Sequence, residues 1–298
     1  MCGIVGLFLK DNLLESELGG MLSQMLITMT DRGPDSAGIA VYGGGDTDRI
    51  KVSIQSENPD GDFDALSATL LEAIGDTFDV ERKSTHAIYS FAKRNLPTVK
   101  SVLRERYPNL TTMSSGQTME IFKEVGLPKD VVSRFGIDEM TGTHGIGHTR
   151  MATESAVTTN GAHPFSTGAD QCLVHNGSLS NHNNLRRELT HNGIALETQN
   201  DSEVAAAYLT WRMQSGANLG EALEASLADL DGFFTFVVGT KDGFGVLRDP
   251  IACKPAVLAE TDQYVAFGSE YRALADLPGI GEAHIWEPEP ATVYFWER

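Results

Sequence analysis

An apolar run begins almost at the first residue of the chain. Residues 3–9 read GIVGLFL, and an uncharged stretch of this length is typical of a strand buried on both faces. Because such a strand is part of the core, we expect the amino terminus to be fixed within the fold. The preceding residue, Cys2, would then have a defined position and would not lie on a loose tail.

The next segment predicts a helix followed by a second strand. From Glu15 to about Asp31 the apolar residues recur at helical spacing, and the turn RGPD at residues 32–35 ends the pattern. The run from Ala37 to Tyr42 is then typical of a buried strand.

Short β-rich runs separated by helices follow Gly145. Strands grouped at hairpin-like spacing and interleaved with pairs of helices indicate an α+β protein, in which helices cover antiparallel sheets. The expected strands are Gly145–His148, Gln171–His175, Phe233–Val238, Gly245–Leu247, Ala256–Leu258 and Tyr264–Phe267, and the expected helices are Ser202–Gln214 and Leu219–Leu227.

The segment from about residue 56 to residue 140 has a different character. It alternates charged and apolar residues, with helical spacing near Leu66–Ile74 and near Gln117–Val125 and a strand-like run at Thr85–Phe91. Because it has neither low complexity nor a repeat, we expect a folded, mostly helical insertion and not a linker.

Charge and composition exclude several classes of function. The formal net charge of -18 repels nucleic acid and anionic membranes. No stretch approaches the roughly 20 apolar residues of a membrane span, and the amino terminus lacks a signal-peptide layout. Cys2, Cys172 and Cys253 are widely scattered and lack metal-ligand spacing, which suits a reducing compartment. We therefore expect a cytoplasmic protein without a metal site.

Cys2 has the chemistry of an amino-terminal nucleophile. Its side chain is small enough for an aminopeptidase to remove Met1, which would leave a thiol and a free α-amine on one residue. Such an amine has a pKa of about 7.7–8.0, so it can take the thiol proton and return it to a leaving ammonia. Taken alone, a cysteine at position two could equally be there by chance.

Ordered motifs carry a resemblance to a known family. The segments MCGIVGLF, RGPDSAG, HTRMAT, HP, HNG and NDSEV occur in this order, and together they closely resemble class II glutamine amidotransferases. The resemblance continues through residues 248–250, 254–255 and 269–270. It implies the N-terminal-nucleophile hydrolase fold, a four-layer αββα sandwich of two antiparallel sheets. One domain would span residues 2–298, with the insertion at about 56–140.

The resemblance assigns the attacking group and the oxyanion donors. Cys2 would attack the side-chain amide of glutamine, and the Asn176 amide and the Gly177 backbone N–H would stabilise the negative oxygen that forms. Both residues follow the apolar run Cys172–Val174, which we expect to end there in a turn. An ordinary hairpin is the alternative, because Asn-Gly is a common turn dipeptide.

Further residues match the family's glutamine-binding positions. Arg150 would bind the α-carboxylate through its guanidinium fork, with Thr153 hydrogen bonding nearby. Asp201 would bind the α-ammonium, although Asp201 or Ser202 could instead only cap the helix that begins there. His163 would line the site in a supporting role. The surrounding polar positions implied by the resemblance are Arg32, Asp35, Gly38, Arg248, Asp249, Ser269 and Glu270.

The chain departs from amino-sugar-forming members of the family beside the arginine. Those members have Trp and His where this sequence has Met151 and Glu154. The departure affects the expected covering of the pocket and the strength of glutaminase activity, and it leaves the expected fold unchanged.

The acceptor of the amino group is expected on another chain. The sequence ends at Arg298, shortly after the amidotransferase features, without room for a synthase domain. It looks most like the amidotransferase subunits of N-methylglutamate synthase and of glutamate-synthase-like complexes. That resemblance implies a hetero-oligomer with an FMN and iron–sulfur subunit, plus a further small subunit in some complexes, and it implies no cofactor in this chain. The alternatives are an N-terminal-nucleophile hydrolase of another amide and a catalytically silent structural subunit.

Overall fold

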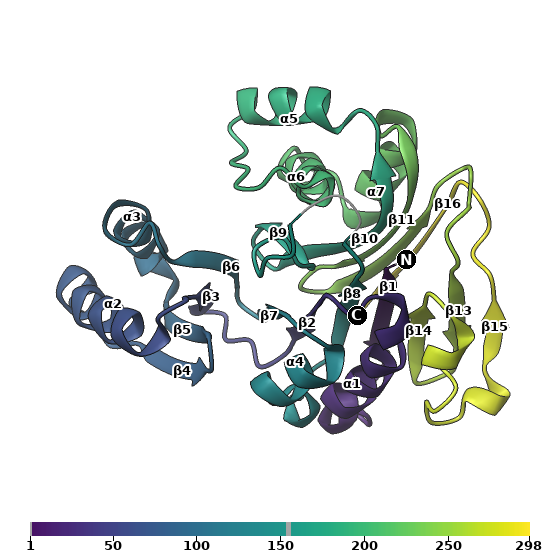
Figure 1. Ribbon diagram of the computed structural model, residues 1–298, viewed down its shortest axis with the longest axis horizontal. Coiled ribbons are helices and arrows are strands. Elements are labelled where there is room, and N and C mark those ends of the chain that lie inside the picture. The colour runs from purple at the N-terminus through teal and green to yellow at the C-terminus, as the bar shows by residue number, and fades with distance from the viewer. Residues whose placement is uncertain (1, 153–155) are drawn as a thin grey trace.

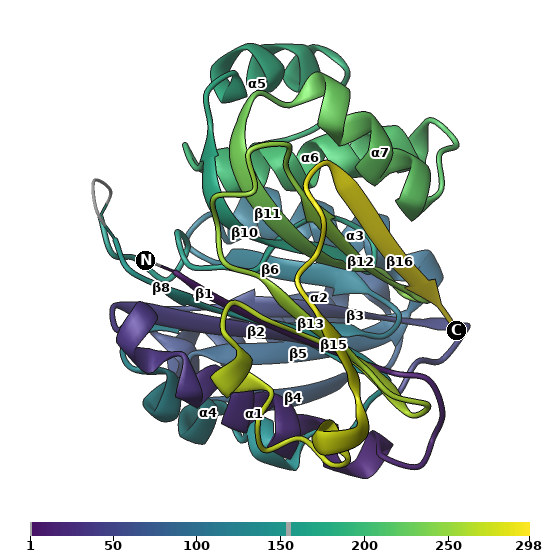
Figure 2. The same cartoon turned by 90° about the vertical axis from the view of Figure 1, so that its right-hand side faces the viewer.

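The computed structural model describes residues 2–152 and 156–298, and its main body has four layers. Helices form the two outer layers and antiparallel sheets form the two inner layers, as Figure 2 shows from top to bottom. Helices α5 (His182–His191), α6 (Asp201–Gln214) and α7 (Leu219–Asp229) cover one sheet, and α1 (Leu18–Thr28) and α4 (Pro128–Phe135) cover the other. The expected αββα sandwich is therefore confirmed.

The larger sheet has seven strands and is antiparallel throughout, in the order β15-β13-β14-β1-β8-β2-β7. Its first strand in the chain, β1, lies near the centre between β8 and β14. The bounds are β1 (Gly3–Leu9), β2 (Ser36–Tyr42), β7 (Met119–Val125), β8 (His144–Arg150), β13 (Val257–Glu260), β14 (Tyr264–Gly268) and β15 (His284–Trp286).

The second sheet has five antiparallel strands in the order β16-β12-β11-β10-β9. Apolar side chains on the facing sides of the two sheets fill the space between them, with Ile4, Phe8, Val174 and Phe244 almost fully buried there. The bounds are β9 (Phe165–Gly168), β10 (Gln171–Leu179), β11 (Gly232–Gly239), β12 (Gly243–Arg248) and β16 (Thr292–Glu297).

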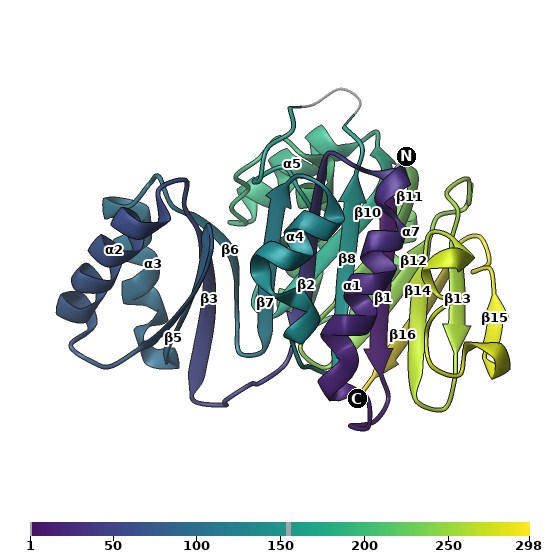
Figure 3. The same ribbon diagram turned by 60° about the horizontal axis from the view of Figure 1, so that its bottom comes forward.

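The insertion forms a lobe with its own sheet and its own core, beside the main body in Figures 1 and 3. Its four strands have the order β4-β5-β3-β6, and helices pack on one side of them. The expected helix near Leu66–Ile74 and strand near Thr85–Phe91 are both present. The bounds are β3 (Arg49–Gln55), α2 (Pro59–Ile74), β4 (Asp79–Lys83), β5 (His86–Ala92), α3 (Leu96–Arg106) and β6 (Thr111–Gly116).

The insertion in the structure has limits that differ from the expected range of about 56–140. The separate sheet already includes β3 from Arg49, and it ends with β6 at Gly116. The following strand β7 pairs with β2 of the main body, and α4 packs against α1. The lobe is therefore organised around a sheet, with α2 and α3 on it, which the expectation of a mostly helical insertion did not include.

The helical spacing predicted near Gln117–Val125 is wrong, because this segment forms strand β7. Ile121 contributes to the core between the two sheets, whereas its neighbour Phe122 packs in the core beneath α1 and α4. A strand covered on both faces places apolar residues next to each other in the sequence, and this arrangement imitates helical spacing.

A buried carboxylate ties the insertion to the second sheet. Asp170, in the turn between β9 and β10, accepts hydrogen bonds from the backbone N–H groups of Gln117 (2.7 Å), Thr118 (2.8 Å) and Met119 (3.0 Å). A Cβ on Gly116 would lie 2.1 Å from the same carboxylate, so only glycine fits this approach. The β6–β7 connection is thereby fixed where the chain leaves the lobe.

Several histidines lie in the core without a charged partner. Burial lowers the pKa of His86 and of His148 to about 3, and it lowers the pKa of His144 to about 4. In the unfolded chain such rings titrate near pH 6.5. Between these values the unfolded chain binds more protons than the folded protein, so acid favours unfolding.

We expect the stability contributed by these neutral histidines to be complete above pH 6.5 and to be lost as the pH falls toward 4. Each histidine that is protonated only on unfolding adds about 1.4 kcal/mol per pH unit to the slope. Urea unfolding between pH 7.5 and 5 measures this slope. The variant His144→Phe keeps an aromatic ring beside Tyr42 and should reduce the slope by about one such increment, and an unchanged slope would contradict this assignment.

Candidate active site

Cys2 lies at the beginning of the central strand β1, where several segments meet. Its backbone carbonyl accepts hydrogen bonds from Arg32 Nε (3.0 Å) and from Asn176 Nδ2 (3.2 Å). Its Sγ lies 4.0 Å from the carbonyl oxygen of Met151, just beyond the end of β8. The thiol is therefore held at the edge where the two sheets open, whereas Met1 lies outside the described residues.

The neighbourhood of Cys2 is fixed by polar contacts from distant parts of the chain. Ser269 Oγ accepts a hydrogen bond from the backbone N–H of Ile4 at 2.9 Å. Arg32 pairs with Glu270 at 2.5 Å, and this interaction lowers the pKa of the Glu270 carboxyl. Asp35 accepts a hydrogen bond from the N–H of Ala152 at 2.7 Å. Arg32, Glu270 and Ser269 hold the start of β1 in place, and Asp35 holds the segment after β8.

Asn176 and Gly177 lie within a strand and not in a turn. Strand β10 continues from Gln171 to Leu179 and pairs with β11 along this whole length, so the hairpin-turn alternative is wrong. Its pairing with β9 ends at Leu173, three residues before Asn176. The Asn176 amide has two N–H donors, of which one contacts Cys2.

Gly177 occupies a position that excludes any side chain. Its φ of 155° lies in the region that favours glycine. A Cβ there would lie 2.0 Å from the carbonyl oxygen of Phe233 and 2.8 Å from Nε2 of His175. Glycine at position 177 therefore allows the backbones of β10 and β11 to approach each other closely.

Arg150 ends strand β8 directly beside the start of β1. Thr149 is paired with Gly3, so Arg150 lies opposite Cys2. The Arg150 side chain is 6% exposed, and its Nη1 donates to the carbonyl oxygen of Ala156 at 3.2 Å. The guanidinium is thus fixed by the loop that follows it. Thr153, the expected neighbour in glutamine binding, and Glu154 lie outside the described residues.

Asp201 lies in the first turn of α6, beside the end of β10. Its Oδ2 accepts a hydrogen bond from the N–H of Leu179 at 2.9 Å, and its Oδ1 lies 3.8 Å from Nδ1 of His175. The helix is capped by Asn200, whose side chain accepts from the N–H of Ser202 at 2.9 Å, so neither Asp201 nor Ser202 is the cap. The Asp201 carboxylate, 22% exposed, keeps some access to solvent.

His163 is buried beneath the site together with two other histidines. Its ring lies 4.0 Å from the ring of His148 and 5.0 Å from that of Phe165. Burial lowers the pKa of His163 well below its usual value. Neither ring nitrogen has a hydrogen-bond partner among the residues that the structure describes. His148 Nε2 in turn contacts the carbonyl oxygen of His175 at 3.2 Å, which links the layer to β10.

Two buried charged residues near the site were not singled out from the sequence. Lys123 and Glu124 on β7 are 3% and 8% exposed, and both contact the loop after Arg150. The only sequence signal is a charged pair inside the apolar run of residues 119–125, which helical spacing would place on a polar face.

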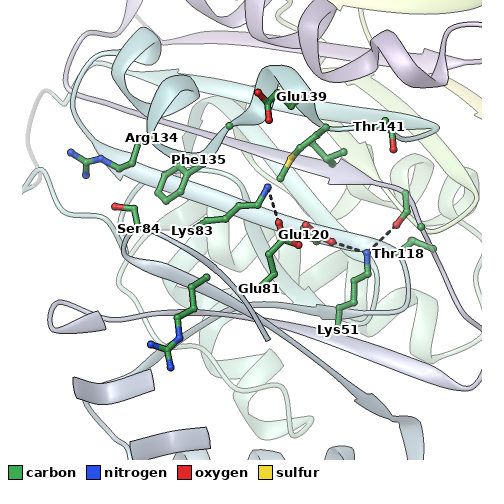
Figure 4. Close-up of a pocket in the computed structure, with 16 residues that line it drawn as sticks. Lys51, Glu81, Lys83, Ser84, Thr118, Glu120, Arg134, Phe135, Glu139 and Thr141 are labelled. Atoms are coloured by element: carbon green, nitrogen blue, oxygen red, sulfur yellow. Dashed lines mark hydrogen bonds and ion pairs between the residues drawn. The ribbon is translucent and has the colours of Figure 1, made fainter. Parts of the chain in front are cut away.

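Two cavities lie between the insertion and the main body. One has a volume of about 690 Å³ and is lined by charged side chains, among which Lys51 and Glu120 pair at 2.6 Å (Figure 4). The other, of about 770 Å³, borders residues 157–160 of the loop after Arg150. Neither lining includes Cys2. Among residues 2–152 and 156–298, no cluster of His, Cys, Asp and Glu could hold a metal ion, and no helix is long and apolar enough to cross a membrane.

The architecture and the position of the cysteine define the class of the protein. A four-layer αββα sandwich with a cysteine at the start of a central strand is the N-terminal-nucleophile hydrolase fold. The solved structure of glutamine phosphoribosylpyrophosphate amidotransferase from B. subtilis shares this fold with a TM-score of 0.63 at 19% identity. The match covers 99% of this chain and 47% of that chain, so the present chain spans about half of the solved protein.

Sequence comparisons identify the family. A family model described as a glutamine amidotransferase domain matches residues 148–276. The glutamine amidotransferase-like protein GlxB of Rhizobium meliloti (strain 1021) is 68% identical, over 100% of this chain and 99% of that protein. A relative from Methanothermobacter thermautotrophicus is 34% identical over 99% of each chain. The chain therefore belongs to the class II glutamine amidotransferase family.

We expect Gly177→Ala to destabilise the fold by at least about 2 kcal/mol, since the new Cβ meets backbone atoms that cannot move away. Gly281→Ala is the matched control, because no atom lies within 4 Å of its Cβ position. Urea unfolding of both variants measures the difference. Equal midpoints for Gly177→Ala and the parent would show that β10 and β11 do not approach each other this closely.

Proposed function

We propose that this chain is a glutaminase subunit, which hydrolyses the side-chain amide of glutamine with Cys2 as nucleophile after removal of Met1. The observation that carries the proposal is the 3.2 Å hydrogen bond from the Asn176 amide to the backbone carbonyl oxygen of Cys2, on strand β10 where Gly177 follows. An amide donor and a backbone N–H beside a thiol are what acyl transfer requires.

The proposed reaction has two steps at one residue. The α-amine takes the thiol proton, and the sulfur of Cys2 attacks the amide carbon of glutamine to form a tetrahedral oxyanion. Asn176 and Gly177 donate to that oxygen. The carbon–nitrogen bond then breaks, and the proton returned by the α-ammonium leaves with ammonia. Water attacks the resulting thioester, the carbon–sulfur bond breaks, and glutamate is released with the thiol restored.

The charged groups around Cys2 fit the two charged ends of an amino acid. In the proposal Arg150, opposite Cys2, binds the α-carboxylate, and Thr153 assists it. Asp201, whose second oxygen is 3.3 Å from Ser202 Oγ, binds the α-ammonium. His163 supports the site from below by packing against His148 and Phe165. A guanidinium and a carboxylate that bind these two ends would select glutamine over amides that lack these charges.

We further propose that the ammonia passes to a separate cytoplasmic partner. The relative GlxB of Rhizobium meliloti, matched over 99% of its own length, has almost the same length as this chain. The resemblance to the amidotransferase component of N-methylglutamate synthase favours a glutamate-synthase-like partner that carries FMN and an iron–sulfur cluster, with a further small subunit in the hetero-oligomer. This chain would itself need no cofactor.

We expect Cys2→Ala to lower ammonia release from glutamine by at least about 1,000-fold, because no other group in the proposal can form the thioester. Cys253→Ser is the matched control, since Cys253 is an exposed cysteine elsewhere in the chain, and it should retain the parental rate. Mass spectrometry of the purified protein should show a mature chain that begins at Cys2. Parental ammonia release by Cys2→Ala would exclude the mechanism, and a retained Met1 would favour the silent structural subunit.

The partner proposal is tested by purification from the native host. A tagged chain should bring down a larger subunit, with flavin absorbance near 450 nm as expected of bound FMN, on the order of one flavin per complex. Iron analysis of the same sample checks for the cluster. Recovery of the chain alone, or with a partner that lacks flavin, would contradict this part of the proposal while leaving the glutaminase assignment intact.

A further inference from the structure

Strand β7 carries two neighbouring charged side chains, and both are buried. Lys123 is 3% exposed and Glu124 is 8% exposed. Because successive residues of a strand point to opposite faces, the two charges leave β7 on different sides of the sheet. Buried charges are costly unless they are bonded, so their partners indicate what the two residues do.

Among the described residues, the hydrogen bonds of the Lys123 side chain all go to one short segment. Its Nζ donates to the backbone carbonyl oxygens of Asn160 (3.2 Å), Ala162 (2.8 Å) and Pro164 (3.3 Å). An ammonium group has three N–H donors, and here each carbonyl oxygen can receive one of them. Lys123 therefore gathers the end of the loop that follows Arg150.

The buried environment of Lys123 disfavours the charged ammonium form of its side chain. Burial lowers its pKa to about 7, while Glu203 and Glu197 act in the opposite direction. Neither carboxylate forms an ion pair with Lys123 among the described residues. The three carbonyl oxygens, together with the Phe165 ring whose centroid lies 4.7 Å from Nζ, are thus the direct partners that compensate its burial.

Glu124 contacts the same loop from the other side of β7. One carboxylate oxygen accepts a hydrogen bond from Thr159 Oγ1, and the other accepts one from Thr85 Oγ1 at 3.0 Å. Thr85 belongs to the β4–β5 turn of the insertion. Arg134 on α4 approaches the second oxygen at 3.6 Å. Glu124 is therefore a bridge between the insertion and the loop.

The loop held in this way contacts Arg150. The carbonyl oxygen of Ala156 accepts a hydrogen bond from Arg150 Nη1 at 3.2 Å, and the segment 156–164 continues to the points bound by Glu124 and Lys123. Any displacement of the segment therefore moves a partner of the guanidinium. Carboxylate binding by Arg depends on the direction of its planar fork, so such a displacement would weaken it.

We propose that Lys123 and Glu124 are positioning residues, which hold residues 156–164 so that Arg150 is directed at the glutamine carboxylate, and that Glu124 extends this support to the insertion through Thr85. The proposal rests on the glutaminase function proposed above. It gives the insertion a purpose in substrate binding. Neither residue is proposed to touch glutamine.

The same strand offers a matched control for general docking of the insertion. Glu120, also on β7, pairs with Lys51 of the insertion at 2.6 Å (Figure 4). This pair joins the lobe to the body as Glu124 and Thr85 do, but no hydrogen bond of Glu120 to residues 156–164 is found among the described residues. A substitution that breaks the Lys51–Glu120 pair therefore removes a contact between the insertion and the main body. It leaves the contacts of residues 156–164 unchanged.

The test compares steady-state glutaminase kinetics of Lys123→Met, Glu124→Ala and Glu124→Gln with those of Glu120→Gln. We expect KM for glutamine to rise about tenfold in Lys123→Met and Glu124→Ala with kcat within about threefold, because ground-state binding is what changes. Glu124→Gln keeps two bonding atoms and should recover part of the loss, whereas Glu120→Gln should match the parent. A kcat loss at constant KM, or an equal effect in Glu120→Gln, would overturn the proposal.

Milder substitutions test the bridge itself. Thr85→Val and Thr159→Val each remove one hydroxyl from Glu124 with little change in volume. If the insertion acts through Glu124, each should raise KM for glutamine about threefold, and the double variant should raise it by less than the product of the two. Strictly multiplicative effects, or no effect of Thr85→Val, would show that the insertion does not support the loop.

Hydrogen exchange separates failure of this proposal from failure of the proposed function. In the absence of glutamine, the amides of residues 156–163 should exchange at least about tenfold faster in Lys123→Met and Glu124→Ala than in the parent, with unchanged exchange in the core strand β1. If the parent shows no glutaminase activity but this exchange pattern holds, the function fails and the loop support remains. Parental exchange in both variants would overturn the loop support whatever the activity.

Discussion

The burial of β1 on both faces is the constraint on which the site depends. This strand lies between β8 and β14 within its sheet, with the core of the sandwich on one side and α1 on the other. Cys2 comes directly before it, so its backbone cannot shift without disturbing the core. Arg32 and Asn176 then fix the Cys2 carbonyl oxygen. Cys2 stands second in the sequence but precedes the central strand of a seven-stranded sheet, and for this reason distant segments can be arranged around it.

Strands with a continuous apolar run, and helices whose apolar residues recur at helical spacing, could be predicted from the sequence. Strands β1 and β2 and helices α1, α6 and α7 fall within a few residues of the expected ranges. Strand β7 was harder, because it is covered on both faces and therefore lacks the alternation that marks a strand. Helix α5 was missed for another reason: its mostly polar sequence from His182 to His191 buries only Leu185 and Leu189.

The motifs identified which segments meet, but they could not give the contacts between them. Ordered matches led to Arg150 and Asn176, which the fold places beside Cys2, and to Asp201, which contacts the end of β10. Within the motif, the Asn-Gly pair was expected in a turn because local propensity favours one. Its true position is set by β11, whose backbone lies too close to Gly177 for any other residue. Tertiary pairing of this kind leaves no local trace in the sequence.

Two loops are each bound by a buried charged side chain, one negative and one positive, and this has a common physical cause. Glu203 accepts from the N–H groups of Glu197 (2.6 Å) and Thr198 (2.7 Å), whereas Lys123 donates to carbonyl oxygens of residues 160–164. A loop that turns into the body cannot pair its backbone with a strand, so side chains must satisfy the buried N–H or C=O groups. An ionised group does this for several at once. The two charges also attract each other, since Glu203 raises the pKa of Lys123 against the effect of burial.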